Sequence, residues 1–212
     1  CDPDRYEDVD QSAARRAVGL PERRTVGYVG RLAAYKGIDT LLDAAPQLWT
    51  EFPDLSILVA GAPSGWAGLE GRLAALDPVS DGRLILREGF DEPERPLLLA
   101  ACDVVVFPSR EESFGMVTIE AWCARRPVVA ADIAAVRSLI RPGEDGELIP
   151  VGDDAELAAV VGSLLRDPAR CHRYGAAGRA RAEADFTWDA IVDRWDGFLA
   201  ESVGRRRARG VR

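Results

Sequence analysis

Several residue types that common enzymes depend on are almost missing from this chain. Its 212 residues include one histidine, one methionine and a single lysine, Lys36. The histidine, His172, stands in an Arg- and Ala-rich helical stretch and is interpreted as a surface residue, so no Ser–His–Asp triad can be assembled around it. The four cysteines show neither CxxC nor metal-ligand spacing, which favours reduced thiols in a cytoplasm. They are Cys1, Cys102, Cys123 and Cys171.

Positive charge and long apolar runs are scarce as well. The net charge of −8 and the pI near 4.8 argue against broad nucleic-acid binding, which needs a basic face. The longest apolar run, residues 97–107, is too short to span a bilayer and is interrupted by Asp103. The chain has no GxxxxGK(S/T) phosphate loop, and GYVGRL lacks the third glycine of a dinucleotide-binding fingerprint.

What the chain does contain is a regular alternation of apolar strands and helices. Strands are expected at residues 25–31, 55–61, 83–90, 103–109, 127–132 and 146–151. Helices are expected between them, and three more, at 153–166, 168–184 and 187–201, follow the last strand. Helices of this length between strands form right-handed βαβ crossovers. The predicted fold class is therefore α/β, with a Rossmann-like parallel six-stranded sheet and helices on both faces.

The chain is expected to divide into three parts. Residues 1–24 form a linker with one short helix, residues 25–201 form the folded domain, and residues 202–212 form a basic tail expected to be disordered. The tail contains five arginines. It is interpreted as a frayed, solvated end or, alternatively, as a contact with anionic lipid head groups.

The helix after the first strand contains two features of its own. Asp39 or Thr40 is expected to cap its amino end. Pro46 lies inside the same helical pattern and predicts a kink or a break there.

The stretch from Phe107 to Ala131 contains a pair of carboxylates, Glu112 and Glu120, with seven residues between them, and Glu111 beside the first. It reads as a strand end, a polar turn, a helix and a second buried strand, so the turn opens at the carboxyl edge of a parallel sheet, where ligands bind. Eight helical steps would place the two carboxylates about 12 Å apart. Glycosidases hold their catalytic carboxyls about 5–9.5 Å apart. The pair is thus expected to recognise two parts of one long ligand.

Two cations follow the first strand and are expected at the same edge of the sheet. Arg31 and Lys36 would face the amino end of the helix that begins near Gly115, and together they would bind a doubly charged anion such as a diphosphate. The alternative is that both are ordinary surface charges. The two glutamates have an alternative interpretation as well: Glu120 would be a solvated helix residue, and Glu112 would interact with the helix dipole.

The motifs VGRLAAYKGIDTLLDAA and DVVVFPSREESFGMVTIEAW resemble the donor-binding, C-terminal domain of a retaining GT-B glycosyltransferase of family 4. The resemblance extends over residues 1 to 200, nearly the whole chain. It implies a nucleoside diphosphate sugar as donor, no metal and no cofactor. It also implies a separate N-terminal domain that binds the acceptor, which would be a sugar, a lipid-linked precursor or a small molecule. The expected location is cytoplasmic, with the inner face of a membrane as the alternative.

The resemblance assigns a role to each residue of the expected site. Glu112 contacts the transferred sugar, Glu120 holds the ribose, and Arg31 and Lys36 hold the diphosphate; Glu112, Arg31 and Lys36 are the expected catalytic set. The remaining donor-binding positions are Gly30 beside Arg31, Gly89 and Phe90 against the base, and the turn and first helical residues Ser113, Phe114, Gly115, Met116 and Val117 at the phosphates.

The chain departs from the family pattern at two places. Arg125 and Arg126 replace a small glycine turn, and Ala134, Ala135 and Ser138 replace a Gly-Gly pair with a following glutamate. The second departure leaves open an alternative function, a nucleotide-sugar-binding module that has lost transfer. A sugar phosphorylase on the same fold would need a cofactor lysine site, and the sequence shows none.

Overall fold

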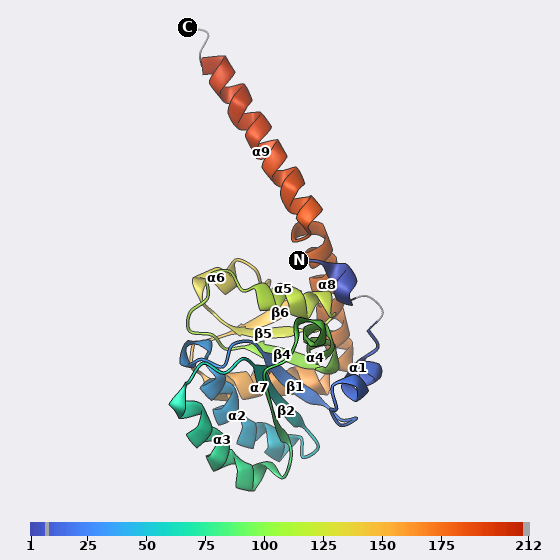
Figure 1. Ribbon diagram of the computed structural model, residues 1–212, viewed down its shortest axis with the longest axis vertical. Coiled ribbons are helices and arrows are strands. Elements are labelled where there is room, and N and C mark those ends of the chain that lie inside the picture. Colours follow the sequence, from blue (N-terminus) through green and yellow to red (C-terminus); the bar gives the residue numbers. More distant parts are fainter. Residues whose placement is uncertain (7–8, 210–212) are drawn as a thin grey trace.

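The computed structural model describes residues 1–6 and 9–209. Its centre is one sheet of six parallel strands in the order β3-β2-β1-β4-β5-β6 (Figure 1). The strands are β1 (Thr25–Val29), β2 (Ser56–Gly61), β3 (Leu84–Glu88), β4 (Val104–Phe107), β5 (Val128–Ala131) and β6 (Gly146–Ile149). The predicted α/β fold with a six-stranded parallel sheet is confirmed, and each strand is shorter than its predicted run by one to three residues.

Helices cover both faces of the sheet. Helices α2 (Ile38–Glu51), α3 (Ala67–Ser80) and α7 (Asp154–Arg166) pack together on one face. Helices α1 (Gln11–Ala17), α4 (Arg95–Ala101), α5 (Met116–Cys123) and α8 (Pro168–Asp185) pack together on the other. Helix α6 is a single turn, Ala134–Arg137, and the chain turns at Ser138. This arrangement follows from right-handed crossovers in opposite directions on the two sides of β1.

The central strands are buried from end to end. Every residue of β1, β2, β4 and β5 is buried, which explains why their sequences are continuous apolar runs rather than alternating ones. Gly27 and Gly61 allow close contacts, because a Cβ on Gly27 would lie 2.2 Å from Cys102 Sγ and one on Gly61 would lie 1.6 Å from Gly30 O. Strand β3 lies at the edge and is partly exposed.

The strand order reverses between β1 and β4, and this reversal positions the site. Chain connections leave the carboxyl ends of these two neighbouring strands in opposite directions, which opens a crevice between them. The loops that contain Lys36 and Glu112 follow β1 and β4. The predicted positions therefore meet at one edge of the sheet.

The prediction that Asp39 or Thr40 caps α2 is wrong. The helix begins at Ile38, directly after Gly37, whose φ of 66° is left-handed. Asp39 lies inside the first turn, where it accepts two hydrogen bonds from Arg110, at 2.8 and 2.7 Å. Burial opposes ionisation of Asp39, but these bonds and the charge of Arg110 outweigh it and lower its pKa.

Pro46 does not break α2, which continues to Glu51. The proline is exposed, so its ring lies on the solvent side of the helix and does not disturb the packed side. The hydroxyl of Thr50 also donates to Pro46 O at 2.9 Å. The helix instead ends at Phe52, which is buried in the core.

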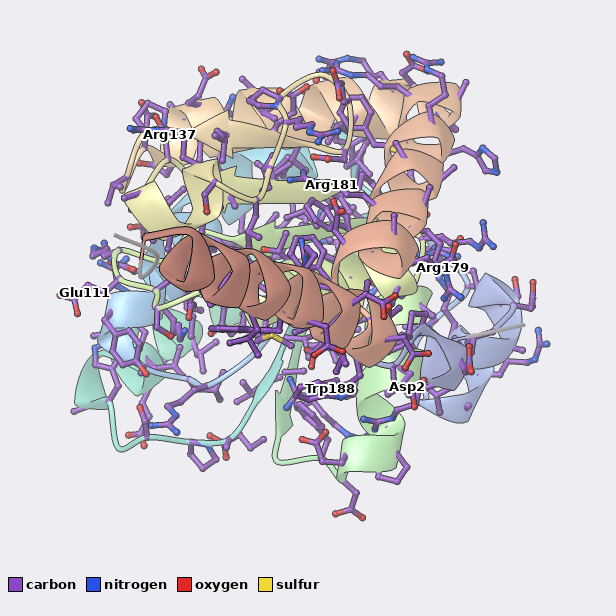
Figure 2. All side chains as sticks on the ribbon, turned by 90° about the horizontal axis from the view of Figure 1, so that it is seen from above. Asp2, Glu111, Arg137, Arg179, Arg181 and Trp188 are labelled. Carbon is purple, nitrogen blue, oxygen red and sulfur yellow. The ribbon has the colours of Figure 1, made fainter. Side chains whose placement is uncertain are left out.

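The last helix, α9 (Trp188–Arg209), is longer than predicted and extends away from the domain (Figure 1). Residues 202–209, expected to be a disordered tail, continue this helix, while residues 7–8 and 210–212 lie outside the described part. Figure 2 shows α9 from above, with Trp188 at its start and Asp2 nearby; both line a hollow beside the amino end of the chain. No helix in the described residues is long and apolar enough to cross a membrane.

Candidate functional site

A cavity of about 500 Å³ opens at the carboxyl edge of the sheet, where the strand order reverses. Four loops and the start of α5 contribute to it, and a size of several hundred Å³ is typical of small-molecule sites. Predicted positions that line it are Gly30, Arg31, Lys36, Gly89, Phe90, Glu112, Gly115 and Val117. Side chains that the sequence did not single out include Tyr28, Tyr35, Glu92, Arg95, Ser109 and Thr118.

An ion pair joins two of the charged groups that line this cavity. Lys36 Nζ donates to Glu112 Oε2 at 2.5 Å, and the side chains are only 16% and 18% exposed. The other carboxylate oxygen, Glu112 Oε1, accepts from the backbone N–H of Ser113 at 3.3 Å. The only lysine of the chain and the first carboxylate of the Glu-x7-Glu motif thus form one unit that crosses from the β1 loop to the β4 loop.

Glycine makes this close approach of the two loops possible. A Cβ on Gly37 would lie 1.9 Å from Pro108 O, and its left-handed φ of 66° favours glycine independently. The N–H of Arg110 also donates to Tyr35 O at 2.8 Å. The loop that carries Lys36 is therefore fixed to the loop that carries Glu112 by backbone contacts on both sides.

Arg31 is the free cation of the cavity. Its side chain is exposed, and in the described residues it has no ion pair. Its backbone is fixed, because Tyr28 donates its hydroxyl hydrogen to Arg31 O at 2.7 Å. Burial and the nearby charge of Glu112 raise the pKa of Tyr28, so the phenol stays neutral and keeps this donor.

The amino end of α5 points at the same cavity. Gly115 is its N-cap with a left-handed φ of 89°, and no described side chain caps the first turn. The first amides of the helix therefore stay available to an anion. Ser113, Phe114 and Met116 are exposed beside the cavity and are not among the residues that line it; Phe114 packs against Phe186 with ring centroids 6.2 Å apart.

Glu120, expected to contact the ribose, does not line the cavity. Arg95 lines the cavity, whereas Glu120 stands behind it, with Arg95 Nη1 3.5 Å from Glu120 Oε2. Burial raises the pKa of Glu120, and the charge of Arg95 only partly offsets this effect. In the described structure Glu120 Oε2 and Arg95 Nε are buried without a hydrogen-bond partner. These two unsatisfied atoms indicate a place for a polar ligand group or a water molecule.

Arg95 is the functional candidate that the sequence reasoning missed. Its guanidinium lies over the ring of Phe90, 5.1 Å from the centroid, and is hydrogen-bonded to Glu92 at 3.1 Å. Phe90 and Arg95 together thus form a flat wall at the end of the cavity expected to hold the base. The available signal was an arginine at the first turn of α4, directly before an otherwise apolar helix.

The loop after β5 borders the cavity through Val136, on α6. Ala134 and Ala135 form the first turn of α6, and Ser138 ends it by donating its hydroxyl hydrogen to Ala135 O at 2.7 Å. The loop expected near the transferred sugar therefore presents an apolar side chain, Val136, to the cavity.

Comparison with known proteins shows the family of this chain. The family model for glycosyl transferases group 1 matches residues 10–181. The chain belongs to the glycosyl transferases group 1 family. The D-inositol 3-phosphate glycosyltransferase of Nocardia farcinica is 34% identical over 218 residues, which cover 98% of this chain and 48% of that protein. This group 1 chain thus spans about half the length of the relative that it matches.

Two solved structures have the same fold as this group 1 chain. Anabaena HepE in complex with UDP is 27% identical, with a TM-score of 0.84, and the match covers 95% of this chain and 56% of that one. The C-terminal domain of LpcC, a group 1 protein from Francisella tularensis, is 21% identical with a TM-score of 0.81, and the match covers 89% of this chain and 99% of that domain. The fold is therefore that of a C-terminal GT-B domain.

Proposed function

We propose that this chain binds a nucleoside diphosphate sugar in the carboxyl-edge cavity and supplies the donor half of a retaining glycosyltransferase of family 4. The observation that carries the proposal is the Lys36–Glu112 ion pair beside the open amino end of α5. This arrangement places a cation, a carboxylate and free amides within one site. Support also comes from Anabaena HepE, which binds UDP and, in a second complex, UDP-glucose.

The proposed chemistry depends on charge that develops as the leaving group departs. Departure of the nucleoside diphosphate adds negative charge to its terminal phosphate. Lys36, Arg31 and the first amides of α5 would stabilise this charge more in the transition state than in the ground state. Glu112, held by Lys36, would lie at the sugar, and Glu120 with Arg95 at the ribose.

Retention requires attack on the face from which the diphosphate leaves. In the proposed mechanism a leaving phosphate oxygen accepts the proton of the acceptor hydroxyl, so no protein base is needed. Metal and cofactor independence are part of the same proposal, because Lys36, Arg31 and the α5 amides supply the positive potential. The cytoplasmic location and a peripheral membrane contact remain predictions from the sequence.

The acceptor would be bound by a separate N-terminal domain of the whole protein. Relatives named for D-inositol 3-phosphate make that compound the first acceptor to test, followed by other sugars, lipid-linked precursors and small molecules. The second candidate function is a nucleotide-sugar-binding module without transfer. It is favoured by the small residues Ala134 and Ala135 and the apolar Val136 at the sugar end of the cavity.

Two measurements test the proposal. Calorimetric titration of the 212-residue chain with UDP, GDP and ADP should show saturable binding of at least one nucleotide; no binding of any of them would overturn the proposed function. Turnover of a panel of nucleotide sugars by the whole protein separates the two candidates. Transfer supports the enzyme, whereas nucleotide binding with neither transfer nor donor hydrolysis supports the binding module.

A further inference from the structure

A second cavity, of about 350 Å³, lies at the opposite, amino edge of the sheet, and we name it the amino-edge cavity. It is formed beneath the starts of β1, β4 and β5 by segments from five parts of the chain. Its charged and polar lining residues are Gln11, Arg24, Asp103, Arg125, Arg126 and His172. Its apolar wall consists of Pro127, Leu164, Leu165 and Pro168, with Cys171 beside them. The donor site at the carboxyl edge uses none of these residues.

Arg126 is a charge with few partners in this cavity. It is partly buried, and in the described residues its only side-chain hydrogen bond runs from Nε to Ala124 O at 3.0 Å. Burial lowers the pKa of Arg126, because it disfavours the charged guanidinium. The two terminal nitrogens of Arg126 can therefore donate hydrogen bonds to a ligand.

The one carboxylate in the cavity is already engaged elsewhere. Asp103 accepts from Arg15 Nη2 at 2.7 Å, from Thr25 N at 2.6 Å and from Gln11 Nε2 at 3.2 Å. Arg24 is likewise paired with Asp54, at 2.8 Å. The excess positive charge of the cavity is therefore concentrated on the two adjacent arginines.

Arg125 holds a backbone conformation that favours glycine. Its φ is 57°, one of two positive values among the non-glycine residues of the described chain. The turn is held tightly against α8, because a Cβ on Gly175 would lie 2.1 Å from Arg125 O. An exposed arginine with no ion pair in the described structure thus occupies a position where glycine would be less strained. Strained positions of this kind are concentrated at functional sites.

We propose that the amino-edge cavity binds a small phosphate ester, with the phosphate on Arg125 and Arg126 and the organic part on the wall of Pro127 and Leu165. Planar guanidinium groups offer paired donors that match phosphate oxygens. The cavity volume is that of a small-molecule site, and its charged and apolar sides suit a ligand with one anionic end. This proposal does not depend on the function proposed for the carboxyl edge.

Phenyl phosphate and inorganic phosphate are suitable probes, and amide NMR titration of the 212-residue chain distinguishes the two cavities. Binding here should shift the amides of residues 124–126 and 171–173 saturably, whereas binding at the donor cavity should shift those of residues 115–118. Phenyl phosphate should bind more tightly than inorganic phosphate because of the apolar wall. Absence of saturable shifts at residues 124–126 with both probes would overturn the proposal.

Two substitutions and a matched control complete the test. Arg126→Gln should weaken phenyl phosphate binding at least tenfold, and Arg125→Gly should weaken it about threefold while relieving the left-handed strain. Neither removes an ion pair, so Arg126→Gln should retain the melting temperature of the wild type, and Arg125→Gly should melt at the same or a higher temperature because the strain is relieved. Arg173→Gln makes the same charge change on α8, outside the cavity, and should bind like the wild type. Equal weakening by Arg173→Gln and Arg126→Gln, or unchanged binding in Arg126→Gln, would overturn the proposal. Either result would mean that phosphate binds non-specifically to basic surface residues.

Discussion

The carboxyl-edge cavity has two ends, and each contains a basic residue and a glutamate. The two ends differ in how well the charged groups are paired and hydrogen-bonded. At one end Lys36 and Glu112 are in direct contact at 2.5 Å. At the other, Arg95 and Glu120 are 3.5 Å apart, and each has a buried atom without a hydrogen-bond partner in the described structure. Both pairs have side chains about one-fifth exposed or less, so solvent alone does not account for the difference.

The difference indicates which part of the site is formed before the ligand arrives. Backbone contacts around Gly37 hold the Lys36 end in place. The Arg95 end has polar atoms that cost free energy while they are unsatisfied, and a diol or a water molecule would satisfy them. We therefore expect the Lys36 end to set the strength of phosphate binding and catalysis, and the Arg95 end to select the nucleoside.

The largest effect is expected from Glu112→Ala. Loss of the carboxylate at the sugar should lower the transfer rate of the whole protein about 100-fold, roughly 3 kcal/mol, while nucleotide affinity stays within about threefold. Rates and calorimetric affinities of the same preparations provide the measurement. Glu111→Ala is the matched control, because Glu111 is exposed at the periphery (Figure 2). Equal loss of binding and transfer in Glu112→Ala would place Glu112 at the phosphates instead.

The next effect is expected from Lys36→Ala. Removal of the cation should weaken nucleoside diphosphate binding by about 1.5–3 kcal/mol, the value of a hydrogen bond to a charged group. Calorimetry measures it, with Arg72→Gln as a control that removes one positive charge outside the cavity. Unchanged affinity would mean that Lys36 does not contact the diphosphate. The proposed difference in role between the Lys36 end and the Arg95 end would then be wrong.

A smaller and more selective effect is expected from Arg95→Leu. The variant should bind the nucleoside diphosphate about fivefold more weakly, ~1 kcal/mol, and bind pyrophosphate like the wild type, because pyrophosphate has no ribose or base. It should also lose part of the preference for the ribonucleotide over its 2′-deoxy analogue. Arg87→Gln, an exposed arginine outside the cavity, is the control. An equal loss for pyrophosphate would mean that Arg95 acts on phosphate.

Most of the fold was predictable from local patterns, because the buried strands are apolar runs with polar ends. The errors arise where a distant residue decides the outcome. Asp39 does not cap α2, since Arg110, 71 positions away, binds its carboxylate. Pro46 is tolerated because it faces solvent. Neither fact is visible in the local sequence.

The candidate site was predictable to a similar extent. Lys36 and Glu112 were expected at one edge from strand positions alone, and the structure brings them together. Arg95 was missed because its role depends on Phe90, in the loop before α4, and on Glu120, which the packing of α4 against α5 brings close to it. The left-handed conformation of Arg125 was hidden for a related reason, since the turn is shaped by α8.

The pH dependence of stability gives the smallest effect and examines the Arg95 end directly. Because burial raises the pKa of Glu120 above its ordinary value of 4.5, the native state keeps a proton that the unfolded chain releases over that pH range. The free energy of unfolding should therefore fall as the pH rises through the raised pKa, and level off above it. Glu120→Gln cannot titrate, so the difference in unfolding free energy between wild type and variant, measured in urea, should show this fall. A difference that rises with pH would mean that Arg95 lowers the pKa of Glu120, and that the two ends of the cavity are equally well paired.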